Sequence, residues 1–451
     1  MPTADVAPLA SLSARERSRF WRVRFRLGEW LSRSLVVVPT LYIVFALALA
    51  ELVPKIGGDG DVLSLKLDAD TARTILSAVA GGMIAFTGLV VSLAVLVVQF
   101  GASQYTPRLV SRFRRDPVVK HSLGIFIAPA IYALVSLRLI GQNGSEVVPS
   151  VTVMVTMALL IAAVLVFFLL VSRLLDLLRP RRVIAQIVDQ AMHAIVDVYP
   201  FSLGQMPSLE LAPDAPVSRV VHHHGRPAVL SALDRARLVR AAAQANTVVE
   251  VAAGIGEYLP PGAPLFLIHG EEDPAVDLAE LRRSAILTDE RTIAQDPAFA
   301  IRAIVDTGLR ALSPAVNDPT TAVQALDGLE TLLIALAGRD LQRGRIADAE
   351  GRLRLLYPTP RWVELLDLAI TEIRHYGADT PQIARRLRSL LLTLRATSPD
   401  LRHEAIDDQL ARLDTAIRTA YPDPVERAHA ETPDHLGLGA SRERELRVDD
   451  A

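Results

Sequence analysis

Residues that could do chemistry are concentrated in and just after the most apolar part of the chain, residues 74–100. Small and polar side chains recur there at intervals of 4, 3, 4, 7 and 4 residues, which places them along one side of a helix. Small residues let helices approach closely in lipid, whereas hydroxyl and amide groups in such a row can hydrogen-bond water or ions along a permeation path. We call this row the small-residue stripe; its members are Gly81, Ala85, Gly88, Ser92, Gln99 and Ser103. The stripe could line a permeation path. It could also be a packing seam, either within one helix bundle or between the subunits of an oligomer.

Signals for enzyme chemistry and metal binding are weak elsewhere. The chain has no cysteine, which excludes thiol nucleophiles, thiolate metal ligands and disulfides. It has neither a G-x-x-x-x-G-K loop nor an H-E-x-x-H motif, and Gly254-Ile255-Gly256 lacks the third glycine of a dinucleotide fingerprint. The run His222–His224 could bind a metal, but neighbouring strand residues point to opposite faces, so at most two imidazoles converge. We expect no catalysis and no cofactor, and metal binding by the histidines stays open.

Four apolar stretches are long enough to cross a membrane, because a bilayer core of about 30 Å requires about 20 helical residues. Between Thr74 and Gln99 no residue is ionisable, so a helix there has no polar face to offer water. This favours membrane spans over the buried helices of a soluble protein. The absence of ionisable residues also disfavours a proton-coupled transporter, which needs ionisable side chains within the membrane to carry the proton. The expected spans of the transmembrane domain, residues 34–178, are 35–53, 74–100, 122–140 and 147–171.

Basic residues alternate between the segments that connect the spans. They are abundant in the N-terminal segment 1–33, between spans two and three, and after span four. The first of the other two connections carries four aspartates between residues 59 and 70, and the second, residues 141–150, has no Lys or Arg. Because basic segments stay on the cytoplasmic side, we expect a bacterial plasma (inner) membrane protein with both termini in the cytoplasm. The first apolar run imitates a cleaved signal peptide at Ala48-Leu49-Ala50, but it is long for one.

The rest of the chain is more polar. From residue 186 onward, 28 Lys and Arg stand against 39 Asp and Glu, a net charge of −11. Apolar runs around Gly225 and Gly262 predict a small α/β module, and later apolar residues at intervals of three and four predict amphipathic helices. The expected fold is mainly α: a four-helix transmembrane bundle plus a cytoplasmic domain made of a small α/β module and an amphipathic helical bundle. The expected boundaries are a helix and Pro-rich connector at 179–216, the module at 217–270, the helical bundle at 271–421 and a disordered tail at 422–451.

Two short stretches outside the spans are distinctive. The first, Phe100-Gly101-Ala102-Ser103-Gln104-Tyr105-Thr106-Pro107-Arg108, follows the second span, and its Gln104, Tyr105 and Arg108 are candidate contacts at the inner membrane interface. Gln104 and Tyr105 could gate a path or simply anchor the end of the span.

The second stretch, residues 310–322, predicts a turn between two helices. Pro314 would end the first helix, and Asp318 or Asn317 would cap the second, which Pro319 opens. The turn is either a rigid corner or a contact point with the basic segments or a neighbouring subunit. The candidate corner residues are Arg310, Ser313, Pro314, Asn317, Asp318 and Pro319.

Together the two stretches resemble the bacterial "predicted membrane protein" family called domain of unknown function twenty-two fifty-four. The resemblance extends from about Arg26 to Tyr421. It implies a prokaryotic plasma-membrane protein with this four-span layout, and it implies no activity.

The leading functional hypothesis is an oligomeric channel-like protein, with the second span lining the path and the cytoplasmic domain assembling or gating it. The alternative is a non-conducting, membrane-anchored sensor or scaffold whose acidic domain binds a cytoplasmic protein partner. The expected partners are the lipid bilayer and further copies of the chain, with no nucleic acid. Membrane-embedded enzyme chemistry is disfavoured because the sequence indicates no polar cluster within the spans.

Overall fold

The computed structural model describes residues 34, 36–56, 68–104, 116–142, 150–177, 179–204, 215–270, 276–341 and 344–439. The chain divides into two compact units with the boundary after Arg182, and each unit is described by itself. The expected N-terminal segment 1–33, and most of the aspartate-rich connection between the first two spans, lie outside the described residues.

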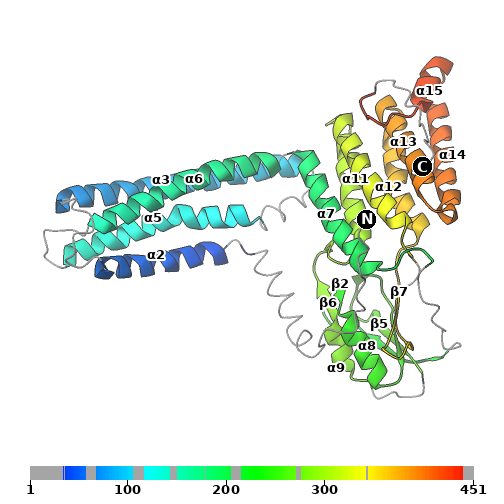
Figure 1. The fold of residues 1–451 in the computed structure, drawn as a ribbon, viewed down its shortest axis with the longest axis horizontal. Helices are drawn as coiled ribbons and strands as arrows, with labels where there is room; N and C mark the ends of the chain where they lie inside the picture. Colours follow the sequence, from blue (N-terminus) through cyan, green and yellow to red (C-terminus); the bar gives the residue numbers. More distant parts are fainter. Residues whose placement is uncertain are drawn as a thin grey trace, which may run out of the picture. The chain divides into compact units, whose positions relative to one another are not determined.

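In its described residues, the first unit is a bundle of four apolar helices, α2 (Val37–Ile56), α3 (Ala69–Gln104), α5 (Pro117–Gln142) and α6 (Ser150–Leu177), which run side by side in Figure 1. Helix α5 packs against the other three. Its Phe126 is fully buried and meets Phe86 of α3 edge to face, with ring centroids 5.5 Å apart. Large apolar side chains such as Leu89 and Leu165 point outward, which is the arrangement that a lipid environment stabilises.

Within the described residues, four helices could cross a membrane by length and composition, and three of them coincide with spans that the sequence predicts. Three lie in α3, α5 and α6, and the fourth is α11 (Pro319–Ala337) of the second unit. Protein buries 61% of the α11 stretch but only 22% of the α6 stretch, so the apolar surface of α11 serves protein packing. The apolar stretch of α2, Val37–Val53, is shorter. The 20 residues of α2 nevertheless reach about 30 Å at 1.5 Å per residue, and α2 stays a predicted span.

The second unit contains two sheets. Five strands pair in the order β1 (Val217–His222), β5 (Pro264–His269), β3 (Val248–Val251), β8 (Leu353–Tyr357) and β7 (Gly344–Ala347). Among the strands that the structure describes, β3 and β8 alone pair in parallel, with Val249 opposite Leu355. The other sheet has the order β4 (Tyr258–Leu259), β2 (Ala228–Leu233) and β6 (Ala285–Thr288). With α8 (Arg235–Gln244) and α9 (Leu278–Ser284), the strands enclose a core that includes Leu230, Leu238, Phe266 and Ile268.

The expectation that residues 271–421 form only a helical bundle is wrong, because β6, β7 and β8 lie in that range. Strand β8 is the clearest case: all five of its residues are buried, since it pairs with β7 on one side and β3 on the other. A strand buried on both faces shows no alternation of polar and apolar residues, so its sequence resembles a helical segment.

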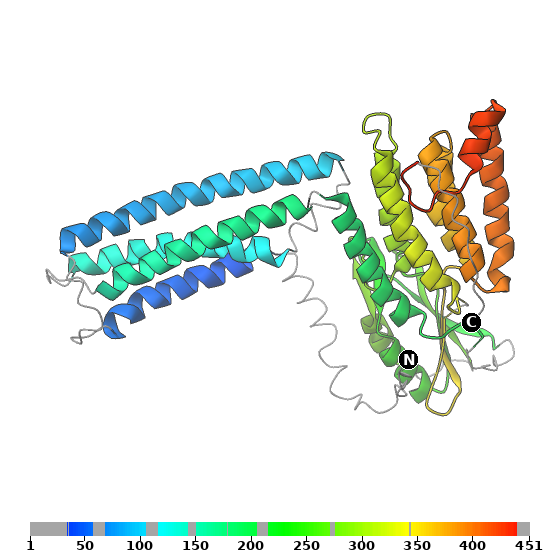
Figure 2. The ribbon, with the colours of Figure 1, turned by 45° about the horizontal axis from the view of Figure 1, so that its top comes forward.

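The other α-helices described in the second unit are α7 (Pro180–Val198), α10 (Pro297–Ala311), α11, α12 (Trp362–Gly377), α13 (Pro381–Thr397), α14 (His403–Ala420) and α15 (Pro424–Glu431). Figure 2 shows α7, α11, α13 and α14 as neighbouring rods. Helices α10, α11 and α15 each begin with proline directly after an aspartate that caps the first turn. Proline is favoured there because the first N–H groups of a helix have no hydrogen-bond partner within the helix, so the N–H that proline lacks is not needed.

The expectation of a disordered tail at 422–451 is wrong for residues 424–439. Helix α15 occupies 424–431, and Asp434 accepts hydrogen bonds from the backbone N–H groups of Leu436 and Gly437. Arg385 of α13 is fully buried and donates to the carbonyls of Thr432 and Gly439. A charged anchor from a distant helix, rather than apolar periodicity, holds this segment. Residues 440–451 lie outside the described residues.

We expect Gly328→Val to destabilise the second unit by about 1–3 kcal/mol, because it overpacks the contact between α7 and α11. A Cβ atom at Gly328 would lie 2.7 Å from Cγ2 of Ile184 and 3.2 Å from Cγ2 of Val188. Gly338→Ala is the control, because nothing lies within 4 Å of its added Cβ. Thermal unfolding of the two variants tests this, and equal melting temperatures would show that α7 does not pack on α11 in solution.

Candidate functional site

The small-residue stripe lies on the outer side of the first unit. Gly81, Ala85, Gly88 and Ser92 are exposed, and a Cβ atom added at Gly81 or Gly88 would meet nothing within 4 Å. The opposite side of α3 is buried against the bundle through large residues that include Leu76, Met83 and Val90. A packing seam inside the bundle, one of the interpretations that the sequence allowed, is therefore wrong. The stripe therefore points away from the other described helices of its own bundle.

The hydroxyl groups of α3 are largely satisfied by the helix itself. The Ser92 hydroxyl donates to the Gly88 carbonyl at 2.9 Å, and the Thr87 hydroxyl donates to the Met83 carbonyl at 2.6 Å. Gln99 is exposed. The stripe is thus a shallow surface on which a second helix backbone could lie closely, with Ser92 and Gln99 as its polar groups.

The inner-interface candidates are mostly outside the described part of the chain. Gln104 is the last residue of α3, and the side chains of Gln104 and Ser103, together with all of Tyr105 and Arg108, lie outside the described residues. An ion pair links the start of α5 to α6: the Nε atom of Arg173 in α6 lies 2.8 Å from the buried carboxylate of Asp116, which directly precedes α5. Asp116 also accepts from the N–H groups of Val118 and Val119 at the start of α5, so it fixes α5 and α6 together.

The candidate corner is a turn whose capping groups form hydrogen bonds within it. Asp318 caps α11 by accepting from the backbone N–H of Thr321 at 3.1 Å and the Thr321 hydroxyl at 2.6 Å. Ser313 donates to the carbonyl of Arg310 at 2.7 Å, and Pro319 is the first residue of α11. Asn317 has a φ of 47°, a left-handed conformation that asparagine tolerates.

The apex of this corner is exposed, from Pro314 to Asn317. The hydrogen bonds of Ser313 and Asp318 anchor the two sides of the apex. Its role as a contact point with a neighbouring subunit or with the basic segments stays a prediction.

The histidine run makes hydrogen bonds to backbone. The Nδ1 atom of His222 lies 2.9 Å from the Gly262 carbonyl, and the Nε2 atom of the buried His223 lies 2.8 Å from the Arg226 carbonyl. The rings of His222 and His224 are 6.5 Å apart. Within the described residues no three metal-ligating side chains gather.

Sequence reasoning missed a hydroxyl cluster inside the four-helix bundle. Tyr132 of α5 is fully buried, and the hydroxyls of Ser136 on the same helix and Thr152 on α6 lie beside it. None of these three buried oxygens reaches hydrogen-bond geometry with a described protein atom. The expectation that the spans hold no polar cluster is therefore wrong. Isolated hydroxyl residues on two helices give no pattern that the sequence alone would reveal.

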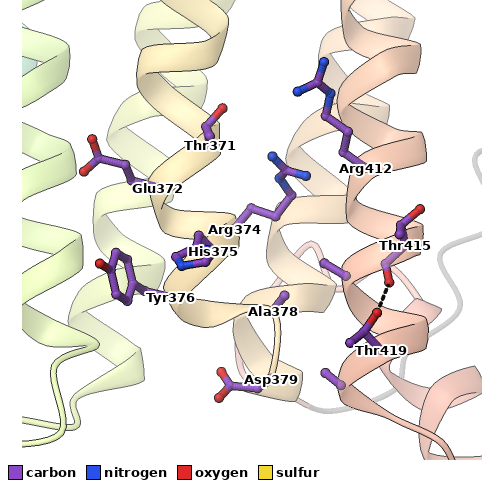
Figure 3. Close-up of a pocket in the computed structure, with 12 residues that line it drawn as sticks. Thr371, Glu372, Arg374, His375, Tyr376, Ala378, Asp379, Arg412, Thr415 and Thr419 are labelled. Carbon is purple, nitrogen blue, oxygen red and sulfur yellow. Dashed lines mark hydrogen bonds between the residues drawn. The ribbon is translucent and has the colours of Figure 1, made fainter.

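Sequence reasoning also missed a groove between α12 and α14, shown in Figure 3. Its volume is about 820 Å³. The guanidinium groups of Arg374 and Arg412 extend from facing helices toward the space between them, with Thr371, Thr415 and Thr419 around them. The two arginines are far apart in sequence and lie on helices that were predicted only as amphipathic, so their convergence required the packed bundle.

A smaller hollow of about 320 Å³ lies where the end of α7 meets β8 and the start of α10. Burial raises the pKa of the Asp296 carboxyl there, although Arg291 pairs with it at 2.9 Å. Burial likewise raises the pKa of the Tyr199 phenol. Asp296 also caps α10 by accepting from the Phe299 N–H, so these polar groups serve the fold.

Comparison of the sequence with known proteins relates the chain to a family of membrane proteins. The model of the family described as Predicted membrane protein (DUF2254) matches residues 32–393. An uncharacterised protein of Mycobacterium bovis and one of Mycobacterium tuberculosis are each 27% identical to the chain over 421 residues, covering 89% of this chain and 79% of theirs. No solved structure matches the chain.

Proposed function

We propose that this chain, which belongs to the Predicted membrane protein family (DUF2254), forms a homo-oligomeric, channel-like assembly in which α3 helices of neighbouring copies meet along the small-residue stripe. The observation that carries the proposal is the exposure of Gly81, Ala85, Gly88 and Ser92 on the outside of their own bundle.

Helix association in lipid gains little from burying apolar side chains, because lipid is equally apolar. It gains from close backbone contact, which small residues permit. The spacing 81, 85, 88 and 92 alternates four and three residues, the pattern of a left-handed crossing near +20°. An exposed glycine row brings no benefit against mobile lipid chains, so its natural occupant is another α3.

The path in this proposal lies on the axis shared by the α3 helices. Ser92 and Gln99 supply the polar groups there, and the absence of ionisable residues between Thr74 and Gln99 fits passive permeation rather than proton coupling. The second unit, with its tightly packed helices, assembles or gates the path. No part of this scheme requires catalysis or a cofactor.

The basic segments place both termini in the cytoplasm of a bacterial plasma membrane in this proposal. A membrane-impermeant thiol reagent should then label Asp61→Cys but not Leu401→Cys in intact cells. The reverse labelling would reject this orientation.

Disulfide cross-linking tests the interface directly, because the chain has no cysteine of its own. Under mild oxidation in membranes, we expect Gly88→Cys and Ser92→Cys to form covalent dimers through α3. Leu165→Cys is the matched control: its side chain is 60% exposed and also faces outward, but from α6. Equal cross-linking at Gly88 and Leu165 would mean that copies meet at random.

Reconstitution into planar bilayers tests the path itself. We expect conductance from the wild-type chain and its loss in Gly88→Leu. A chain that cross-links at Gly88 but conducts nothing under voltage, tension or a salt gradient would favour the alternative, a non-conducting scaffold. The exposed apex of the corner and the acidic charge of the second unit favour that alternative, since both suit a cytoplasmic protein partner.

A further inference from the structure

The groove between α12 and α14 contains a cationic group without a partner. The Nε atom of Arg374 is buried and has no hydrogen-bond partner in the described part of the chain, and Arg374 forms no ion pair there. Elsewhere in the same bundle, arginines are paired: Arg302 with Glu372, Arg386 with Glu330 and Arg395 with Asp407. The Arg374 side chain as a whole is half-buried, and its Nε atom is the part that lacks both solvent contact and a hydrogen-bond partner. A buried polar atom without a partner costs free energy.

The groove lining contains two arginines and two acidic residues, but Glu372 pairs with Arg302 and Asp379 lies beyond the end of α12. Arg412 faces Arg374 across the groove (Figure 3) and forms an ion pair with Asp408 on its own helix at 2.8 Å. Burial, and after it the charge of Arg412, lower the pKa of the Arg374 guanidinium. Asp408 and Asp367 act in the opposite direction but do not outweigh those two effects. The site would therefore be stabilised by an added anion.

We propose that this groove binds a phosphate group, with Arg374 and Arg412 holding its oxygens from the two helices. Guanidinium groups present paired N–H donors that match the oxygens of a phosphate. The exposed Thr415 and Thr419 line the same wall, and each donates its hydroxyl proton to a backbone carbonyl. The Thr415 oxygen accepts from Arg418 at 3.1 Å, so Thr419 offers the hydroxyl oxygen that can accept from a protonated phosphate.

The volume of the groove bears on the kind of ligand. About 820 Å³ exceeds the needs of orthophosphate and lies within the range of small-molecule sites. A phosphorylated metabolite of nucleotide size fits the groove better than the bare ion does. Bound there, it would link α12 to α14. The inference is independent of whether α3 mediates self-association.

Isothermal titration calorimetry on the full-length chain in detergent tests the proposal, with orthophosphate and pyrophosphate as probes at constant ionic strength. We expect binding by the wild type, tighter for pyrophosphate, and a loss of at least tenfold in affinity for Arg374→Gln. Arg374→Lys keeps the charge but not the paired donors, so it should fall between the two. Arg395→Gln is the control, since Arg395 is half-exposed and pairs with Asp407 away from the groove; its affinity should not change.

Two results would overturn the proposal: no binding by the wild type, or equal affinities for the wild type and Arg374→Gln when both are folded by circular dichroism. Titrations in nanodiscs of neutral lipid and of phosphatidylglycerol separate two sources of the phosphate group. A soluble ligand binds equally in both, whereas a site that takes lipid headgroups binds added phosphate more weakly in phosphatidylglycerol. Either pattern supports a phosphate site.

Discussion

Gly88→Leu is expected to convert the assembled protein into monomers, with at least a tenfold fall in the assembled fraction. Leucine at this position would separate two α3 backbones at the centre of the stripe, and overpacking of a close contact costs about 1–3 kcal/mol at each interface. The monomer should be unaffected, because a Cβ at Gly88 meets nothing within 4 Å in its own bundle. Analytical ultracentrifugation in detergent gives the assembled fraction, and the helical circular dichroism signal reports on the fold.

Two other substitutions make this result specific. Leu89→Ile changes the exposed residue next to Gly88 without adding bulk to the stripe, and it should leave assembly intact. Gly124→Leu places bulk inside the bundle, where a Cβ would collide with the Tyr42 ring, and it should disrupt the contact between α2 and α5. If Gly88→Leu assembles like the wild type, α3 does not form the interface and the proposed path loses its basis.

The difference between Gly88 and Gly124 shows what sequence could and could not predict in the membrane unit. Lengths of apolar sequence predicted the four helices, because bilayer thickness sets the length of a span. The row of small residues on α3 was also visible. The direction in which it faces was not, since it depends on large residues such as Leu76 and Met83 finding partners on α5.

In the second unit, the limits of prediction follow from separation along the chain. The small strands around Gly225 and Gly262 were visible because local turns and apolar runs define them. Strand β8 was missed because its partner β3 lies about a hundred residues earlier, and no local pattern reports that pairing. The groove was missed for the same reason: the charges of Arg374 and Arg412 acquire meaning only when α12 and α14 pack together.

Arg385→Leu is expected to destabilise the second unit by about 2–4 kcal/mol and to release residues 424–439 from α13. Arg385 is fully buried and donates to the carbonyls of Thr432 and Gly439 at 2.9 and 2.7 Å. Leucine would leave both acceptors without these donors, and each buried, unsatisfied group costs about 1–3 kcal/mol. The segment can recover part of that cost only by moving into water. Limited proteolysis should therefore cut the variant between α14 and residue 439 much faster than the wild type.

The control for this effect is Arg395→Leu on the same helix. Its side chain is half-exposed and pairs with Asp407 at the surface, where ion pairs contribute little, so neither stability nor the cleavage pattern should change. Equal protease resistance of the wild type and Arg385→Leu would show that the C-terminal segment is held by other contacts, such as the hydrogen bond from Gln382 to the Gly437 carbonyl, rather than by the buried arginine. Faster cleavage in Arg385→Leu alone would establish that a single buried cation orders a segment whose sequence reads as disordered.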